Sequence, residues 1–301
     1  MKTLSRRDAL IYAFSPDNPA KMTIDSGDTI AIETYDCFEN QVSESQPLDK
    51  MDWDRVNPAT GPIYINGAEP GDILQAEIIA IDIADTGVMV TGPGIGIMGH
   101  KVETMTQKSI PIKDGFALFD DKVKIPLNKM VGVIGVAPKE GSINCGVPDQ
   151  HGGNMDTKLI KEGATLYLPI FQKGALFALG DLHAAMGDGE IGVSGLEIEG
   201  KVTVKLTVIK GKSITDPVIE LPEKLAFLSS KETLDEAIKT ATDLAVTFLH
   251  ERSGLSIADA TMLMSAAGDA EICQIVDPLL TARFVIPRYI LEAYGIEGFI
   301  E

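Results

Sequence analysis

Short hydrophobic runs separated by turn-forming residues make up the first two thirds of the chain. Between 201 and 210, apolar side chains alternate with Lys and Thr, which is the period of a strand with one buried face. Residues 73–83, 130–136 and 164–170 are apolar runs rich in β-branched residues and predict buried strands. Many short strands joined by turns predict a β-sandwich or a β-barrel.

The pattern changes in the last third of the chain. Ser229 and Glu232 have capping-box spacing, which predicts a helix over 231–249. Ser256 and Asp259 repeat that spacing before a second helix over 257–267.

Gly268 ends that second helix, and a strand is predicted over 270–276, stopped by Asp277 and Pro278. We therefore expect a β-rich α+β protein. A sandwich-like or barrel-like catalytic body over 1–211 is followed by a smaller α+β unit over 212–301.

Composition narrows the classes of partner. The chain has 301 residues, with 44 acidic against 26 basic side chains, a formal charge of −18. This charge repels phosphate backbones and anionic membranes, so neither is an expected partner. No apolar run approaches the roughly 18 residues of a membrane span, and the apolar stretch 9–14 is too short for a signal peptide. Three scattered cysteines form no disulfide framework, and we expect a cytoplasmic protein.

The segment 177–190 carries the densest candidate chemistry. If it begins as a strand, Asp181 and His183 project from the same face. A carboxylate beside an imidazole suits a Zn²⁺ ligand pair, or a carboxylate that orients a histidine base. Asp188 and Glu190 add two acids, which would equally suit Ca²⁺. The alternative is a solvated acidic turn beside a histidine with a purely structural role.

A second candidate region is the polar, glycine-containing segment 148–156. Its glycines allow the backbone to approach a ligand, Asn154 can both donate to and accept from an amide, and Asp156 can bind a metal or a substrate. An ordinary hydrogen-bonded turn is the alternative. Glu140, just past an apolar strand, and Asp36, after an alternating stretch, are further candidates. For both, the alternative is a surface or turn residue.

Other motifs are weaker. Gly94, Gly96 and Gly99 match the dinucleotide fingerprint, but no helix is expected to follow them, so we interpret them as turn residues. The chain has no Gly-x-Ser-x-Gly elbow, and Cys145 is expected to be a small buried apolar residue. Hydrolysis would therefore use an activated water rather than a covalent nucleophile.

Four segments together resemble the acetamidase/formamidase family: 57–72, 132–138, 151–156 and 180–190. The likeness extends over nearly the whole chain. It implies hydrolysis of short aliphatic amides to a carboxylate and ammonia, a β-rich body with an α+β C-terminal part, a homodimer or higher homo-oligomer, and a divalent metal.

The mechanism that fits both the residues and the resemblance is metal-assisted hydrolysis. In this hypothesis Zn²⁺, or alternatively Ca²⁺, is held by Asp36, Asp181 and His183, with Glu190 as a fourth ligand. Glu140 is the general base, and Asn154 and Asp156 orient the amide.

Two other functions remain open from the sequence. One is a non-catalytic β-domain protein that binds Ca²⁺ or a small ligand, and the other is an enzyme that opens a different C–N bond, such as that of a cyclic imide. An imidazole beside the carboxylates favours the amidase over a pure Ca²⁺ module, which needs only oxygen ligands.

Overall fold

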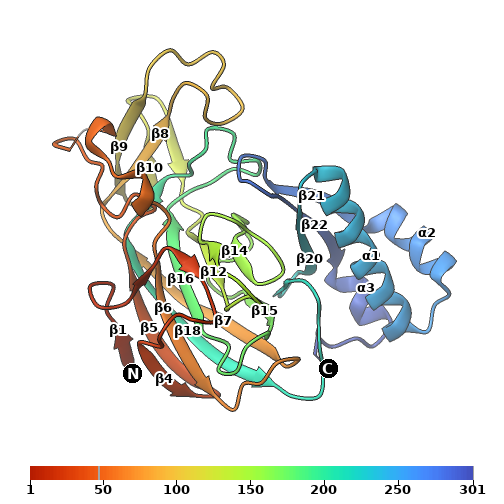
Figure 1. Cartoon of the computed structure of the whole chain (residues 1–301). Coiled ribbons are helices and arrows are strands. Elements are labelled where there is room, and N and C mark those ends of the chain that lie inside the picture. The colour runs from red at the N-terminus through yellow and green to blue at the C-terminus, as the bar shows by residue number, and fades with distance from the viewer. Residues whose placement is uncertain (47, 301) are drawn as a thin grey trace.

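The computed structural model describes residues 1–46 and 48–300, and two large β-sheets form most of it (Figure 1). In the first sheet nine strands follow the spatial order β1 (Lys2–Leu4), β5 (Asp28–Thr34), β18 (Gly200–Ile209), β7 (Ile73–Ile83), β15 (Thr165–Pro169), β19 (Val218–Leu221), β20 (Lys224–Lys231), β22 (Leu280–Pro287) and β21 (Asp269–Gln274).

The second sheet has eleven strands. Eight follow the order β11 (Lys124–Pro126), β10 (Phe116–Leu118), β9 (Thr106–Lys113), β8 (Thr86–Thr91), β17 (Glu197–Ile198), β16 (Phe177–His183), β12 (Met130–Gly135) and β14 (Gly152–Asn154). The other three join through β16 and are β6 (Ala59–Asn66), β2 (Leu10–Ile11) and β4 (Met22–Asp25). A separate pair is formed by β3 (Ala13–Phe14) and β13 (Ile143–Asn144).

The main hydrophobic core lies between the two sheets, as expected for a sandwich. It contains the inward-facing residues of β18, which are Val202, Val204 and Leu206. The polar residues between them are only partly buried, so the alternating pattern in the sequence predicted this strand correctly. The predicted buried strands over 73–83, 130–136 and 164–170 appear as β7, β12 and β15.

Three α-helices cover the other face of the nine-stranded sheet at its C-terminal end (Figure 1). They are α1 (Leu234–Ser253), α2 (Ile257–Ala267) and α3 (Arg288–Ala293). Strand β20 shows why two cores can share one sheet. Leu225 and Phe227 point into the core beneath the helices, whereas Ala226 and Leu228 point into the core of the sandwich. Two short 3₁₀ turns, Leu48–Lys50 and Trp53–Arg55, lie in the body.

The first helix begins later than the sequence pattern predicted. Ser229 and Ser230 belong to β20 and pair with β22, so the predicted start at 231 is wrong. The capping box lies four residues further on, where the Thr233 hydroxyl accepts from the backbone N–H of Glu236. Tertiary pairing of the strand thus outweighed a local capping signal. The second helix does begin after Ser256 and end before Gly268 as predicted.

The proposed division into 1–211 and 212–301 crosses a continuous sheet. Strand β19 pairs with β15 of the body, with Thr165 opposite Glu220, and so joins the C-terminal unit to the body. Residues 47 and 301, which those ranges include, lie outside the described residues. The glycines at 94, 96 and 99 lie in turns, and the next element is β9 rather than a helix, so the context of a dinucleotide site is missing. None of the helices in the described part of the chain is long and apolar enough to span a membrane.

Candidate active site

Strand β16 carries Asp181 and His183 into the interior of the body. Every residue of this strand is buried, because β12 pairs along one edge while β6 and β17 share the other. Asp181 Oδ1 lies 3.4 Å from Nε2 of His183. The segment is therefore a buried strand rather than a solvated turn, and the two side chains meet at its end.

Three more carboxylates surround the same imidazole nitrogen. Glu197 Oε2 lies 3.2 Å from His183 Nε2, Asp156 Oδ1 lies 3.7 Å from it, and Glu190 Oε1 lies 3.8 Å from it. Glu197 reaches this place because it stands directly opposite His183 in the β16–β17 ladder. We call Asp156, Asp181, His183, Glu190 and Glu197 the His183 cluster.

Two further polar residues adjoin the cluster. The Asn154 side-chain amide donates a hydrogen bond to Asp277 Oδ2 over 3.0 Å. Burial and the neighbouring carboxylates of Asp156 and Asp181 raise the pKa of Asp277 well above its usual value. The cluster thus continues toward the loop after β21, and the C-terminal unit contributes to the site.

Two glycines, which have no side chain, provide the room that the cluster needs. A Cβ atom at Gly132 would lie 2.4 Å from Asp156 Oδ1 and 2.6 Å from Asp181 Oδ2. A Cβ atom at Gly195 would lie 2.5 Å from Nδ1 of His183. Any larger residue at either position would displace a cluster side chain, so these glycines are part of the site's construction.

The backbone is strained where it carries the carboxylates. Asp156, Asp181 and Glu190 all have left-handed φ angles, of 38°, 56° and 47°. Such a conformation costs of order 1 kcal/mol or more for a non-glycine residue and is typical of functional sites. Three instances in one cluster indicate that the fold stabilises this arrangement at the expense of local backbone energy.

Burial and neighbouring charges perturb the titration of the cluster. Burial raises the pKa of Glu190 to about 8, even though His183 acts in the opposite direction. Burial likewise raises the pKa of Glu197 to about 7 and that of Asp156 well above its usual range. For His183 burial favours the neutral ring, but Glu197 and Asp181 outweigh it and raise the pKa of the imidazole well above its usual value. The cluster therefore retains protons unless another positive charge enters.

Several atoms of the cluster have no hydrogen-bond partner although they are buried. They include Asp156 Oδ1, Asp181 Oδ1, Glu197 Oε2 and His183 Nδ1. Unpaired buried polar atoms are costly, and they are rare unless they bind water or an ion. Asp156, His183 and Glu190 offer ligand atoms within 4.8 Å of one another, and Cys37, Asp181 and Glu197 do the same. Oxygen, nitrogen and sulfur donors together suit a transition metal such as Zn²⁺ better than Ca²⁺.

The other predicted site residues are placed differently. Asp36 is buried, and its Oδ1 accepts from the backbone N–H groups of Phe38 and Asn40, so one oxygen is used to shape the loop. Asp36 belongs to neither group of potential ligands. Glu140 is an exposed residue of the turn after β12. Asp188 forms ion pairs with Arg283 and Lys158 and is not available to the cluster.

Sequence reasoning missed Glu197, Asp277 and Cys37. Glu197 is an acid inside the apolar stretch 196–198, which is a usable signal for a functional carboxylate. Its position opposite His183 depends on the β-ladder, which the sequence does not specify. Cys37 is buried, and burial with the nearby carboxylates of Glu197 and Asp181 raises its pKa well above the usual value. As expected, Cys145 is a buried residue with a raised pKa, of about 12.

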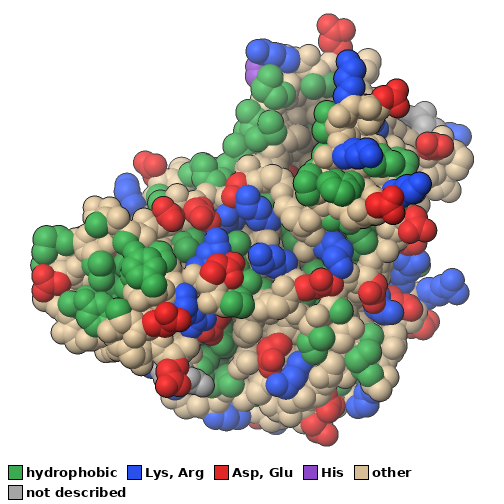
Figure 2. Space-filling view, turned by 180° about the vertical axis from the view of Figure 1, so that it is seen from behind, with side chains coloured by type: hydrophobic (Ala, Val, Ile, Leu, Met, Phe, Trp, Pro, Cys, Tyr) green, Lys and Arg blue, Asp and Glu red, His purple; other side chains and the backbone are tan. Residues whose placement is uncertain are grey.

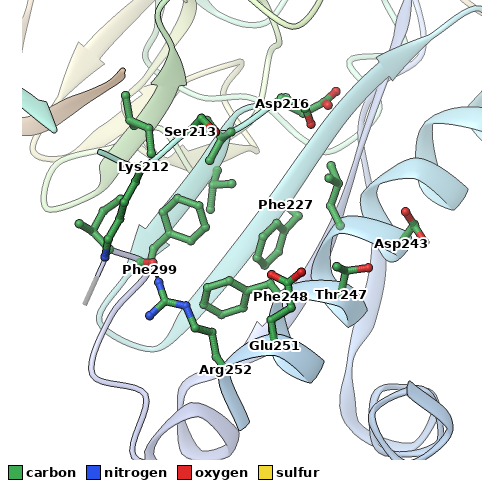
Figure 3. A pocket seen from close by; sticks show the side chains of 16 residues that line it. Lys212, Ser213, Asp216, Phe227, Asp243, Thr247, Phe248, Glu251, Arg252 and Phe299 are labelled. Carbon is green, nitrogen blue, oxygen red and sulfur yellow. Dashed lines mark hydrogen bonds between the residues drawn. The ribbon is translucent and has the colours of Figure 1, made fainter. Parts of the chain in front are cut away.

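A cavity of about 590 Å³ adjoins the cluster and shares Glu190 with it. A second cavity, of about 520 Å³, lies in the C-terminal unit between α1 and the loop that contains Lys212, Ser213 and Asp216 (Figure 3). Figure 3 shows Phe227, Phe248 and Phe299 side by side on its wall. None of its lining residues belongs to the His183 cluster.

The chain is similar to known proteins over almost its whole length. The model of the Acetamidase/Formamidase family matches residues 2–145 and 140–293. A crystal structure of a predicted acetamidase/formamidase from Thermoanaerobacter tengcongensis is 49% identical, with 99% of each chain covered and a TM-score of 0.95. An acetamidase from Bacillus halodurans is 45% identical, with 97% of this chain and 99% of that chain covered and a TM-score of 0.95.

Curated relatives are more distant and longer. A formamidase from Methylophilus methylotrophus is 24% identical, over 65% of this chain and 63% of its own length. The chain thus spans slightly less than two thirds of the length of this relative and of a formamidase-like relative from Schizosaccharomyces pombe.

Proposed function

Because the chain belongs to the acetamidase/formamidase family, we propose that it hydrolyses short aliphatic amides to a carboxylate and ammonia at the His183 cluster. The observation that carries this proposal is the set of four buried carboxylates around one imidazole nitrogen, several with unpaired oxygens. Such an arrangement is unfavourable in a purely structural core, and it is suited to binding a cation and moving protons.

We propose that Asp156, Asp181, His183 and Glu190 hold a divalent metal, with Zn²⁺ favoured over Ca²⁺. The unpaired oxygens and the space left by Gly132 and Gly195 support this fit. When bound, the metal would polarise the amide carbonyl and lower the pKa of water from about 15.7 toward about 7. Asp36 stays a predicted ligand, but its hydrogen bonds to Phe38 and Asn40 make it a better support for the loop that carries Cys37.

We assign the general base to Glu197. Its Oε2 is buried and lies 3.2 Å from His183 Nε2, so it can take a proton from water and deliver it to the departing nitrogen. The prediction that Glu140 is the base is untested, and its exposed position favours Glu197. Asn154, whose Oδ1 is unpaired, is proposed to accept a hydrogen bond from the substrate N–H. The sequence predicted that Asp156 contacts the substrate. That role stays a prediction, and the position of Asp156 favours a role in holding the metal.

The test is metal content combined with ammonia release from formamide, acetamide and butanamide. We expect about one equivalent of a transition metal, turnover of at least one amide, and loss of turnover on chelation that the same metal restores. Full turnover after complete removal of metal would contradict the proposed role of the metal. Absence of turnover in the metal-loaded protein would favour the alternative of a binding protein.

We also propose that the protein forms a homodimer or a higher homo-oligomer. Hydrophobic side chains gather on the surface of the C-terminal unit (Figure 2). The exposed large ones among the described residues of this unit are Ile257, Met262, Ile272, Tyr289 and Tyr294. Exposed apolar patches of this kind often form protein–protein interfaces. A monomeric mass by light scattering at micromolar concentration would contradict this. A cytoplasmic location stays a prediction.

A further inference from the structure

The cavity beside Glu190 has an apolar lining. Its hydrophobic residues come from four segments of the body and are Met89, Ile125, Pro126, Ala185, Met186, Ile191 and Leu196. Its connection to the cluster is direct, because Glu190 belongs to both. Gly195 also lines the cavity and packs against the ring of His183.

The other polar side chains of this cavity are engaged within the protein. Asn128 donates to the carbonyl of Met186 and accepts from its N–H. The hydroxyl of Ser194 accepts a hydrogen bond from the backbone N–H of Val90 and donates one to the carbonyl of Val90. Asp188 is paired with Arg283 and Lys158. Glu190 is left as the polar group that a ligand would meet, at the end nearest the cluster.

The cavity is much larger than the smallest amides. A molecule of formamide or acetamide occupies about the volume of two or three waters, roughly 60–90 Å³. The cavity has about 590 Å³. Such an apolar space next to a reacting centre fits the non-reacting part of a substrate.

We propose that this cavity binds the acyl chain of the substrate, and that the preferred substrates are primary amides with an unbranched apolar chain of about four to six carbons. The inference rests on the proposed amidase function. The cavity is assigned to the acyl part of the substrate because the other product of a primary amide is ammonia, which needs no pocket. The internal hydrogen bonds of Asn128 hold the Met186 wall in place, so the cavity is pre-formed.

The experiment compares kcat/KM for formamide, acetamide, butanamide and hexanamide in the metal-loaded protein. Each buried methylene contributes a factor of about four. We expect kcat/KM to rise from acetamide to hexanamide by one order of magnitude or more. A flat or falling series in an active enzyme would overturn this inference and leave the proposed function intact. No hydrolysis of any of the four amides would overturn both.

A variant that fills the cavity tests whether the acyl chain of the substrate binds there. Gly192 lines the cavity, a Cβ atom there meets nothing within 4 Å, and its φ is not left-handed. Gly192→Phe should therefore reduce the hexanamide-to-acetamide ratio of kcat/KM by about tenfold. Gly187→Leu meets the same conditions and serves if the first variant does not fold.

The matched control is Ser213→Phe, which adds the same ring to the cavity of the C-terminal unit. It should keep the wild-type ratio. If Ser213→Phe lowers the hexanamide-to-acetamide ratio of kcat/KM while both glycine variants keep it, the acyl chain of the substrate binds in the cavity of the C-terminal unit. The inference is then wrong.

Discussion

Two of the buried polar regions in the described part of the chain have opposite electrostatic character. At the Arg283 site, a guanidinium that is 1% exposed donates to Glu271, Asp188 and Thr157, so the charge is matched. At the His183 cluster four carboxylates share one imidazole, and several of their oxygens have no partner. The first region balances its charges within the chain, whereas the second needs a positive charge from outside. This difference separates a structural buried charge from one arranged for binding and catalysis.

The largest effect is expected from removing the imidazole. His183→Ala should lower amide turnover by more than ~10³-fold, because it removes a proposed ligand of the ion that activates water. It should also reduce the metal content while far-UV circular dichroism stays native. His100→Ala, which changes an exposed histidine in a turn, is the matched control and should retain both activity and metal. A well-folded His183→Ala protein with full metal content would exclude His183 as a ligand.

The next effect distinguishes the two candidates for the base. Glu197→Gln keeps the shape of the side chain but cannot accept a proton, and should lower kcat by about 10²–10⁴-fold with metal retained. Glu140→Gln should stay within a few-fold of wild type, since the side chain is exposed. The reverse pattern would restore the assignment made from the sequence.

A pair of stability measurements tests the comparison itself. Arg283→Met should lower the free energy of unfolding by about 3 kcal/mol, because Glu271 loses its partner and Asp188 keeps only Lys158. Asp156→Asn in metal-free protein removes a carboxyl group that burial forces to keep its proton on folding, and it should leave the free energy of unfolding unchanged or increase it. Urea denaturation of both variants and of the wild type, all without metal, gives these values. A large destabilisation by Asp156→Asn would mean that the cluster is balanced without an ion.

The smallest expected effect is a pH dependence of stability in the metal-free protein. Glu190, with a pKa of about 8, and Glu197, with a pKa of about 7, keep protons in the folded state that an unfolded chain has released. The raised pKa of His183 acts in the same direction. The free energy of unfolding should therefore fall between pH 6.5 and 8.

In that window His151 acts weakly in the opposite direction, because burial lowers its pKa to about 4 while an unfolded histidine, with a pKa of about 6.5, still holds part of a proton. Saturating metal should flatten the dependence, since a bound cation favours the deprotonated carboxylates. The double variant Glu190→Gln, Glu197→Gln should flatten it without metal. A metal-free protein that becomes more stable from pH 6.5 to 8 would contradict the raised pKa values.

Elements with strong local patterns can be predicted from the amino-acid sequence alone. The alternation over 201–210 and the apolar run over 73–83 specify strands through side-chain burial, and Ser256 with Gly268 specifies both ends of α2. Asp181 and His183 could be placed together because a strand brings residues two apart to one side. The family resemblance followed from contiguous segments that are visible in the chain alone.

Which distant residues meet depends on how the strands pair and pack in the folded protein. Glu197 opposes His183 through the β16–β17 ladder, Asp156 lies in the segment that follows β14, and Gly132 makes room for Asp156 and Asp181. The same dependence on pairing moved the start of α1, since Ser229 and Ser230 were taken into β20. Register and packing are non-local, so no local pattern encodes them. A catalytic cluster built across strands is therefore visible in part from the sequence and is completed by the fold.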